Sequence, residues 1–159
     1  MSVPLFLTVL VEWLHIVIGI AWVGSHITFD FAILPGLLKR PAAEAKAANE
    51  AISAAAQPLF MSGMLVVVLG IVRGTLLGPI TSLDVLLGTA YGITWLVALV
   101  LTLGIGTWSG LWYGQLLGPV WEGDRIRPGA LRRIRTGTAI TLSGFAIILG
   151  CMVLLGVGL

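Results

Sequence analysis

The chain has 159 residues, of which 58% are hydrophobic and only 10% are charged, and its formal net charge is +2. A soluble domain of this length needs far more charged surface, so the composition predicts an integral membrane protein. The small positive charge gives no reason to expect nucleic acid as a partner, and the lone Cys151 cannot form a disulfide within the chain. The N-terminal residues lack a basic segment and a clear cleavage site, which predicts a retained helix rather than a signal peptide.

Long apolar runs predict four spans in a single all-α domain over residues 1–159, an integral membrane four-helix bundle. The spans are expected at about residues 5–34, 59–78, 85–117 and 136–159. Pro35 and the glycine after it are expected to end the first span. Between Pro41 and Pro58, an alanine-rich segment predicts a short helix outside the membrane over about residues 42–57.

Basic residues gather in the first and third predicted loops, which carry Lys39, Arg40, Lys46, Arg125, Arg127, Arg132, Arg133 and Arg135. Because cytoplasmic loops of membrane proteins are rich in lysine and arginine, both loops are expected in the cytoplasm. Both termini then lie on the non-cytoplasmic side of a multi-pass protein of the cell inner (plasma) membrane. Aromatic residues near the cytoplasmic end of the third span predict an interfacial belt, formed by Trp108, Trp112, Tyr113 and Trp121.

Glycines recur every four residues on two spans, at Gly70, Gly74 and Gly78 on the second and at Gly106, Gly110, Gly114 and Gly118 on the third. Small residues at this spacing let helix backbones approach each other closely in lipid. The repeats are therefore expected to pack helices within one bundle, and a dimer face is the alternative.

The first span carries a polar stripe that includes both histidines of the chain, His15 and His26. At about 100° per residue, the eleven positions between them return to within roughly 20° of the same helix face. Glu12 lies one turn before His15, Asp30 lies one turn after His26, and Trp22 falls in the same sector. Since lipid cannot solvate such a stripe, it is expected to face other helices, water or a cofactor.

Arg73, late in the second span, is expected at the same depth as Glu12 and His15. One interpretation is an ion pair between Glu12 and Arg73, because each group is costly in a membrane when it has no partner. The other is that His15 ligates a metal or a haem while Arg73 holds an anionic group such as a haem propionate. Both interpretations stay open at this point.

His26 and Asp30 are expected deeper, toward the cytoplasmic half of the bilayer. Asp30 is placed to accept a hydrogen bond from His26 and fix its tautomer, as carboxylates do beside ligating imidazoles. Equally, Asp30 can pair with Arg135 or Lys39 near the interface, and His26 can be a structural polar contact rather than a ligand.

The spacing of the histidines limits how a haem is bound. They lie about 16 Å apart along one helix, so they cannot ligate one iron from opposite faces. The remaining options are one axial histidine with an open sixth position, a partner from Met61 or Met64, or a ligand from another chain. Two haems with one histidine each, or simple metal binding by histidine and carboxylate, also remain open.

Several short stretches of the first span carry a family resemblance: Trp13-Leu14-His15, the run Gly19-Ile20-Ala21-Trp22-Val23-Gly24, Phe29 and Leu34-Pro35. Together they resemble the first helix of a superfamily of small four-helix membrane proteins. This superfamily includes copper-resistance D-type (CopD) proteins, HemJ-type protoporphyrinogen oxidases and the membrane domain of cytochrome-c-linked urate oxidases. The resemblance implies that His15 matches the first-helix histidine implicated in b-type haem ligation, and it leaves the reaction open.

We therefore expect a membrane-embedded protein that binds haem b and has a role in electron transfer or haem-linked oxidation. In this hypothesis Glu12, Arg73 and Asp30 orient ligands or bind propionates, while Trp22 packs in the core or against the porphyrin. The protein is expected to act as a homo-oligomer or as a subunit of a larger membrane complex. The alternatives are a non-catalytic accessory or anchor subunit, whose polar stripe only pairs helices, and a copper transporter.

Overall fold

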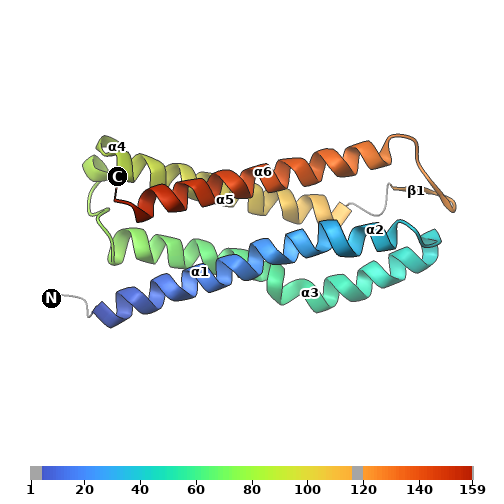
Figure 1. Ribbon diagram of the computed structural model, residues 1–159, viewed down its shortest axis with the longest axis horizontal. Helices are drawn as coiled ribbons and strands as arrows, with labels where there is room; N and C mark the ends of the chain where they lie inside the picture. The colour runs from blue at the N-terminus through green and yellow to red at the C-terminus, as the bar shows by residue number, and fades with distance from the viewer. Residues whose placement is uncertain (1–4, 116–119, 159) are drawn as a thin grey trace.

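The computed structural model describes residues 5–115 and 120–158 of the chain. Four long helices dominate this part, namely α1 (Leu5–Thr28), α3 (Ala42–Ile71), α5 (Ala90–Gln115) and α6 (Ala130–Gly156). They run side by side along one long axis, with α1 packed mainly against α3 and α5 mainly against α6 (Figure 1). The start of α1 and the end of α6 lie at one end of this arrangement, and the connection into α3 lies at the other.

Three helical segments are long and apolar enough to cross a membrane, which is consistent with a multi-pass membrane protein: Leu5–Leu37, Ala90–Trp112 and Ala130–Gly156. The apolar part of the remaining long helix, Met61–Leu76, is shorter. At about 1.5 Å per residue, it falls short of the roughly 30 Å hydrocarbon core of a bilayer. The mostly helical, membrane-type fold is thus confirmed for three segments, while a fourth span and the orientation of the termini stay predictions.

The first span continues past the proline that was expected to end it. After α1 the chain forms a π-helical segment, η1 (Phe29–Ile33), and then a short helix, α2 (Leu34–Leu37). In the π-helical turn the Leu34 N–H bonds to the carbonyl of Phe29, five residues earlier. Pro35 then lies in the first turn of α2, where its missing N–H and fixed backbone angle are tolerated. The wider turn therefore lets the helix continue to Leu37.

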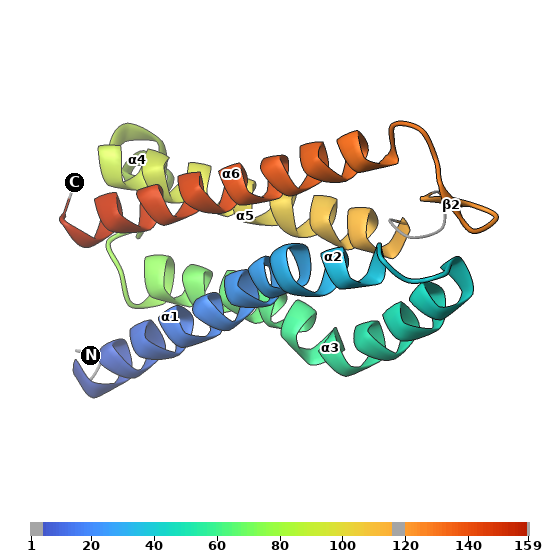
Figure 2. The ribbon, with the colours of Figure 1, turned by 45° about the vertical axis from the view of Figure 1, so that its right-hand side comes forward.

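The second long helix also differs from the expected division at Pro58. Instead of two helices, α3 runs without a break for 30 residues and contains Pro58 in its interior. This helix changes direction along its length (Figure 2). A proline bends a helix because it has no N–H to donate and its ring displaces a backbone carbonyl of the preceding turn. A second π-helical segment, η2 (Val72–Leu76), continues from the end of α3.

The third predicted span begins later than expected, because a short helix precedes it. Ser82 caps α4 (Leu83–Gly88) by accepting a hydrogen bond from the Val85 N–H at 3.2 Å. Thr89 is extended, with φ −119° and ψ 150°, and this breaks the helix before α5 begins. Residues 116–119, which include the predicted end of this span, lie outside the described part.

The basic segment after α5 is a hairpin followed by an early helix start rather than a long loop. Strands β1 (Trp121–Glu122) and β2 (Arg125–Ile126) pair antiparallel, and Gly123 takes a φ of 60° in the turn between them. Gly129, with φ 82°, caps α6, which therefore begins six residues before the predicted span at Thr136. Arg132, Arg133 and Arg135 consequently lie in the first turns of α6.

Aromatic rings that pack against glycines of a neighbouring helix set the distances between the long helices. A Cβ built on Gly63 of α3 would lie 2.7 Å from the indole of Trp22 on α1. On α6, a Cβ on Gly137 would overlap the indole of Trp112. Trp112 is consequently only 9% exposed and belongs to a buried cluster with Phe29, while the interfacial belt stays a prediction.

The glycine repeats of the sequence also receive side chains from neighbouring elements. The His15 ring lies against Gly70, and the Trp95 indole lies against Gly74. On α5, however, a Cβ on Gly110 would meet no atom within 4 Å, so this glycine faces open space. Gly118 and the surroundings of Gly114 lie outside the described part of the chain. Gly70 and Gly74 therefore receive aromatic rings, whereas a Cβ on Gly78 would meet only backbone atoms and one on Gly110 would meet none.

Candidate functional site

The polar stripe predicted on the first span turns inward along its length. Glu12 lies near the start of α1 with a side chain that is 51% exposed, and His15 one turn later is half-buried. Further on, Trp22 is 4% exposed and His26 only 1%. Asp30, in η1, is 7% exposed. The stripe thus runs from an exposed carboxylate at Glu12 to the buried side chains of Trp22, His26 and Asp30.

His15 lines a cavity of about 470 Å³ between α1, the α3–η2 helix, α5 and α6, which we call the His15 cavity. This volume is within the range of roughly 300–1,000 Å³ that is usual for small-molecule sites. Most of its lining is apolar, with Val66, Phe145 and Ile148 among the walls. Its ionisable and hydroxyl-bearing lining residues besides His15 are Glu12, Arg73 and Tyr91.

One nitrogen of His15 has no hydrogen-bond partner in the described part of the chain. The ring lies on Gly70, where a Cβ would be 3.1 Å from its Cε1 atom, and it also has a hydrogen-bond interaction with the backbone of Val66. The Nδ1 atom is buried and makes no hydrogen bond with a described residue. Because a buried polar atom without a partner is costly, this nitrogen is the chief candidate for holding a ligand.

Glu12 and Arg73 form the ion pair that was one of the two interpretations of these residues. The Arg73 Nε and the Glu12 Oε2 atoms are 3.5 Å apart, and the two side chains are 33% and 51% exposed. Both residues line the His15 cavity. The pair therefore brings a guanidinium to the cavity, although one of its N–H groups already faces a carboxylate.

Two further residues of the His15 cavity were not singled out from the sequence. Trp95 of α5 donates a hydrogen bond from its Nε1 to the Gly70 carbonyl at 3.3 Å. Met152 of α6 also lines the cavity, whereas neither Met61 nor Met64, which were expected as partners, does so. The sequence has no pattern that distinguishes Trp95 from the other five tryptophans. Met152 lies in an apolar run, where a methionine is usually a core residue.

His26 lines a second cavity, of about 340 Å³, between α1, α3 and α5, which we call the His26 cavity. Its Nδ1 lies 2.9 Å from the carbonyl oxygen of Trp22, which also accepts a hydrogen bond from the Ser25 hydroxyl at 2.7 Å. Since a carbonyl can only accept, Nδ1 carries a proton, and in the neutral ring Nε2 carries the lone pair. The Trp22 carbonyl is therefore one partner that fixes the tautomer of His26, and the contact expected from Asp30 stays a prediction.

Trp22 and Phe145 separate the two cavities. The ring centroids of Trp22 and Phe145 lie 4.9 Å apart, and Phe145 lies 5.2 Å from the His26 ring, both in edge-to-face arrangements. Trp22 lines both cavities, while Phe145 lines the His15 cavity. The rings of Trp22 and Phe145 therefore form a wall between the two cavities, and this wall packs against His26.

The described residues contain no group of three or more His, Cys, Asp or Glu side chains that could hold a metal ion. A metal site built only from histidine and carboxylate ligands, which the sequence left open, is therefore not assembled in this part of the chain. A cofactor that brings its own metal needs only one ligand from the chain, and each cavity has one histidine.

No protein-family model matches this chain, and comparisons with curated proteins and with solved structures also give no match. The resemblance of the first helix to haem-binding membrane proteins therefore stays a prediction. What the chain binds has to be argued from the geometry of the two cavities.

Proposed function

We propose that this chain is a four-helix protein of the cell inner membrane that binds haem b in the His15 cavity and takes part in electron transfer or haem-linked oxidation. One observation carries the proposal. The His15 Nδ1 atom is buried without a hydrogen-bond partner among the described residues, in a largely apolar cavity of about 470 Å³. A neutral imidazole in such a place is suited to be an axial ligand.

The shape of the cavity supports a large, flat ligand. Gly19 and Gly24 of α1 both line it, and a Cβ built on either would meet no atom within 4 Å. There is therefore open space beside the helix that presents His15. Apolar side chains such as Ile148 exclude water from this space, which suits the apolar ring of a porphyrin.

Charge at the same cavity supports a ligand with anionic groups. Arg73 has guanidinium N–H groups beyond the one that faces Glu12, and these can bind carboxylates such as propionates. Glu12 in turn holds the Arg73 side chain in place. Haem, when bound, supplies one-electron chemistry, while the chain ligates it, orients it and keeps water away.

Each cavity also contains one thioether beside its histidine. Met152 lines the cavity of His15, and Met64 lines the cavity of His26. Methionine is a known second axial ligand for haem iron, so each pair is chemically suited to one haem. A second haem at His26 is the extension of the proposal, because the two histidines are about 16 Å apart and cannot share one.

The proposed topology keeps both termini outside the cytoplasm. The start of α1 and the end of α6 lie at one end of the molecule, and the basic residues of the hairpin and of early α6 belong to the other (Figure 1). An excess of arginine and lysine is typical of the cytoplasmic end. In this topology η2 and the apolar part of α3 form the fourth, shorter span.

The test is the visible spectrum of the full-length protein, purified in detergent after expression with haem supplied. Wild type is expected to show a Soret band and a reduced α-band, and His15→Ala is expected to lose them. Gly19→Leu, which fills the cavity, is expected to reduce haem content strongly. Gly104→Leu is the matched control, because Gly104 is also a helical glycine with open space but does not line either histidine cavity.

Two other outcomes are informative. His26→Ala separates one bound haem from two, since it is expected to halve the haem content only if the His26 cavity is a second site. A colourless wild type that keeps its helical circular dichroism would contradict the proposal.

That contradicting result would favour a non-catalytic accessory or anchor subunit. The observation that supports this alternative is the Glu12–Arg73 pair, because it gives Glu12 of the polar stripe a partner on η2 within the chain. Partners in a homo-oligomer or a larger membrane complex belong to either version of the proposal.

A further inference from the structure

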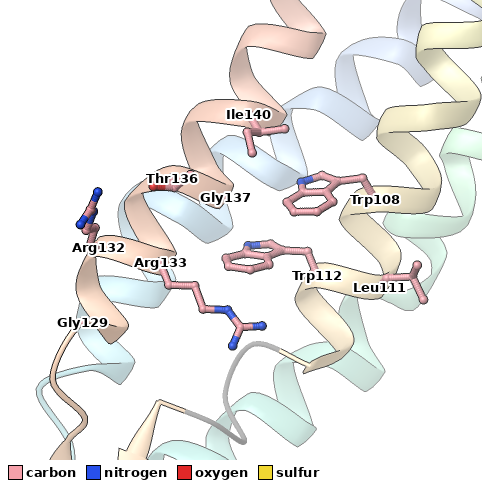
Figure 3. Close-up of a pocket in the computed structure, with 9 residues that line it drawn as sticks. All are labelled: Trp108, Leu111, Trp112, Gly129, Arg132, Arg133, Thr136, Gly137 and Ile140. Atoms are coloured by element: carbon pink, nitrogen blue, oxygen red, sulfur yellow. The ribbon is translucent and has the colours of Figure 1, made fainter.

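A pocket of about 520 Å³ lies between α5 and the first turns of α6, away from both histidine cavities (Figure 3). Trp108 and Trp112 of α5 form one wall, and Arg133 of α6 extends toward them (Figure 3). Thr136 and Arg132 also border the pocket, although the Arg132 side chain points away from the indoles. No residue of this pocket lines either histidine cavity. We call it the Trp–Arg pocket, and the haem proposal does not use it.

The indoles and one guanidinium form a compact stack in the Trp–Arg pocket. The rings of Trp108 and Trp112 lie 5.5 Å apart and nearly parallel, with an interplanar angle of 10°. The guanidinium carbon of Arg133 lies 5.4 Å from the centroid of the Trp112 ring, so this cation rests on an aromatic face. Tryptophan with arginine is the composition expected at the headgroup level of a membrane.

The positive charge at this end of α6 lacks a counter-charge in the described part of the chain. Arg132, Arg133 and Arg135 are exposed, and no carboxylate of a described residue forms an ion pair with them. The first turn of α6 contains no acidic residue either. Because the N-terminal end of a helix already carries partial positive charge, three arginines there strongly favour a bound anion.

An apolar groove continues from the charged end. A shallow hollow of about 710 Å³ on α6 shares Arg132, Thr136 and Ile140 with the Trp–Arg pocket and extends to Ile147. Small side chains, such as Ser143, leave room between Ile140 and Ile147. From Arg132 to Ile147 the helix rises roughly 22 Å, which exceeds the depth of one leaflet of a hydrocarbon core about 30 Å thick.

We propose that this surface binds an anionic phospholipid. The anionic headgroup lies at the start of α6 among Arg132, Arg133 and Arg135, the glycerol lies at the level of the stacked indoles, and an acyl chain follows the groove to Ile147. Basic pockets between membrane helices on the cytoplasmic side bind acidic headgroups by this chemistry. A free phosphate would leave the apolar groove unused, and a second copy of the chain would bring like charges together.

The test is native mass spectrometry of the full-length, delipidated protein titrated with phosphatidylglycerol, with phosphatidylcholine or with glycerol phosphate. Phosphatidylglycerol is expected to bind at least about tenfold more tightly than phosphatidylcholine, and glycerol phosphate only weakly. Arg132→Gln with Arg133→Gln is expected to weaken phosphatidylglycerol binding about 25-fold, since each arginine contributes about fivefold. Arg125→Gln with Arg127→Gln removes the same charge from the exposed hairpin and is expected to change binding less than twofold.

A second variant tests the groove without touching the charges. Ser143→Phe fills the groove and is expected to weaken the lipid while leaving glycerol phosphate unchanged. Val153→Phe is its control, because Val153 is 66% exposed on α6 and lies outside the groove. Equal binding of the two phospholipids, an equal loss in the hairpin control, or glycerol phosphate binding as tightly as the lipid would each overturn the proposal. If the double arginine variant fails to fold, Ser143→Phe decides.

Discussion

The contact between Gly63 and Trp22 gives a sharp prediction about how α1 and α3 are held together. In Gly63→Ala the new Cβ would lie 2.7 Å from both Cε2 and Nε1 of the Trp22 indole. Carbon atoms in contact are normally about 3.5–4.0 Å apart, so the ring or the helix has to move by roughly 1 Å. Trp22 is 4% exposed and wedged against Phe145, so the ring has little room to give way.

Two effects of opposite sign determine the size of the change. Replacing a mid-helix glycine by alanine stabilises a helix by about 0.5–1 kcal/mol, whereas overpacking a core costs typically about 1–3 kcal/mol. We therefore expect Gly63→Ala to lower the free energy of unfolding by up to about 2 kcal/mol. Gly150→Ala, also in a helix but with no atom within 4 Å of its Cβ, is expected to be neutral or stabilising.

The assay is denaturant unfolding in detergent micelles, followed by circular dichroism, on both variants and on the double variant Gly63→Ala with Trp22→Phe. The smaller Phe ring is expected to recover part of the loss, which appears as a coupling free energy in the double-mutant cycle. A Gly63→Ala protein as stable as Gly150→Ala, with no coupling to Trp22→Phe, would refute the reasoning.

Three further predictions concern the polar groups of the two cavities. Glu12→Gln is expected to change the free energy of unfolding by less than about 1 kcal/mol, because both partners of its ion pair are one-third to one-half exposed. A larger loss of stability in denaturant unfolding would contradict this prediction. Trp95→Phe keeps a ring on Gly74 but loses the hydrogen bond to the Gly70 carbonyl, so a loss of about 0.5–1.5 kcal/mol is expected in the same assay. His26→Ala removes a side chain that is 1% exposed, and a loss of about 2–4 kcal/mol is expected, whereas Ser25→Ala, which keeps the ring, should lose less than half as much.

Helical spacing predicted the polar strip and one of its contacts. Trp22, His26 and Asp30 of the polar stripe are buried, His15 is half-buried, and Arg73 meets Glu12 at the depth that the order of the spans implies. These predictions succeed because rotation per residue and rise per residue are fixed by helix geometry. Neither property depends on what the neighbouring helices contribute.

Helix ends were harder to predict, because prolines act differently in apolar helices. Pro35 and Pro58 were expected to end helices, yet the first follows a π-helical turn and the second lies inside α3. Membrane helices tolerate proline where neighbouring helices or local changes of the turn satisfy the freed backbone groups. A sequence shows the proline but not those compensating contacts.

Glycine repeats marked where something packs closely, but not what packs there. Gly74 receives an indole and Gly70 receives an imidazole, whereas Gly110 faces open space. A glycine leaves space that many different side chains can fill, so only the three-dimensional arrangement shows which side chain packs there. For the same reason Met152 and Trp95 entered the candidate site only once the helices were placed beside each other.

The wall between the two cavities decides whether they act as one site or two. His15 and His26 are carried by one helix, so neither can move toward the other to share a ligand. Phe145 touches the rings of both Trp22 and His26 while it faces the His15 cavity. The two cavities therefore share an aromatic wall, in which Phe145 packs on the His26 ring while it lines the His15 cavity.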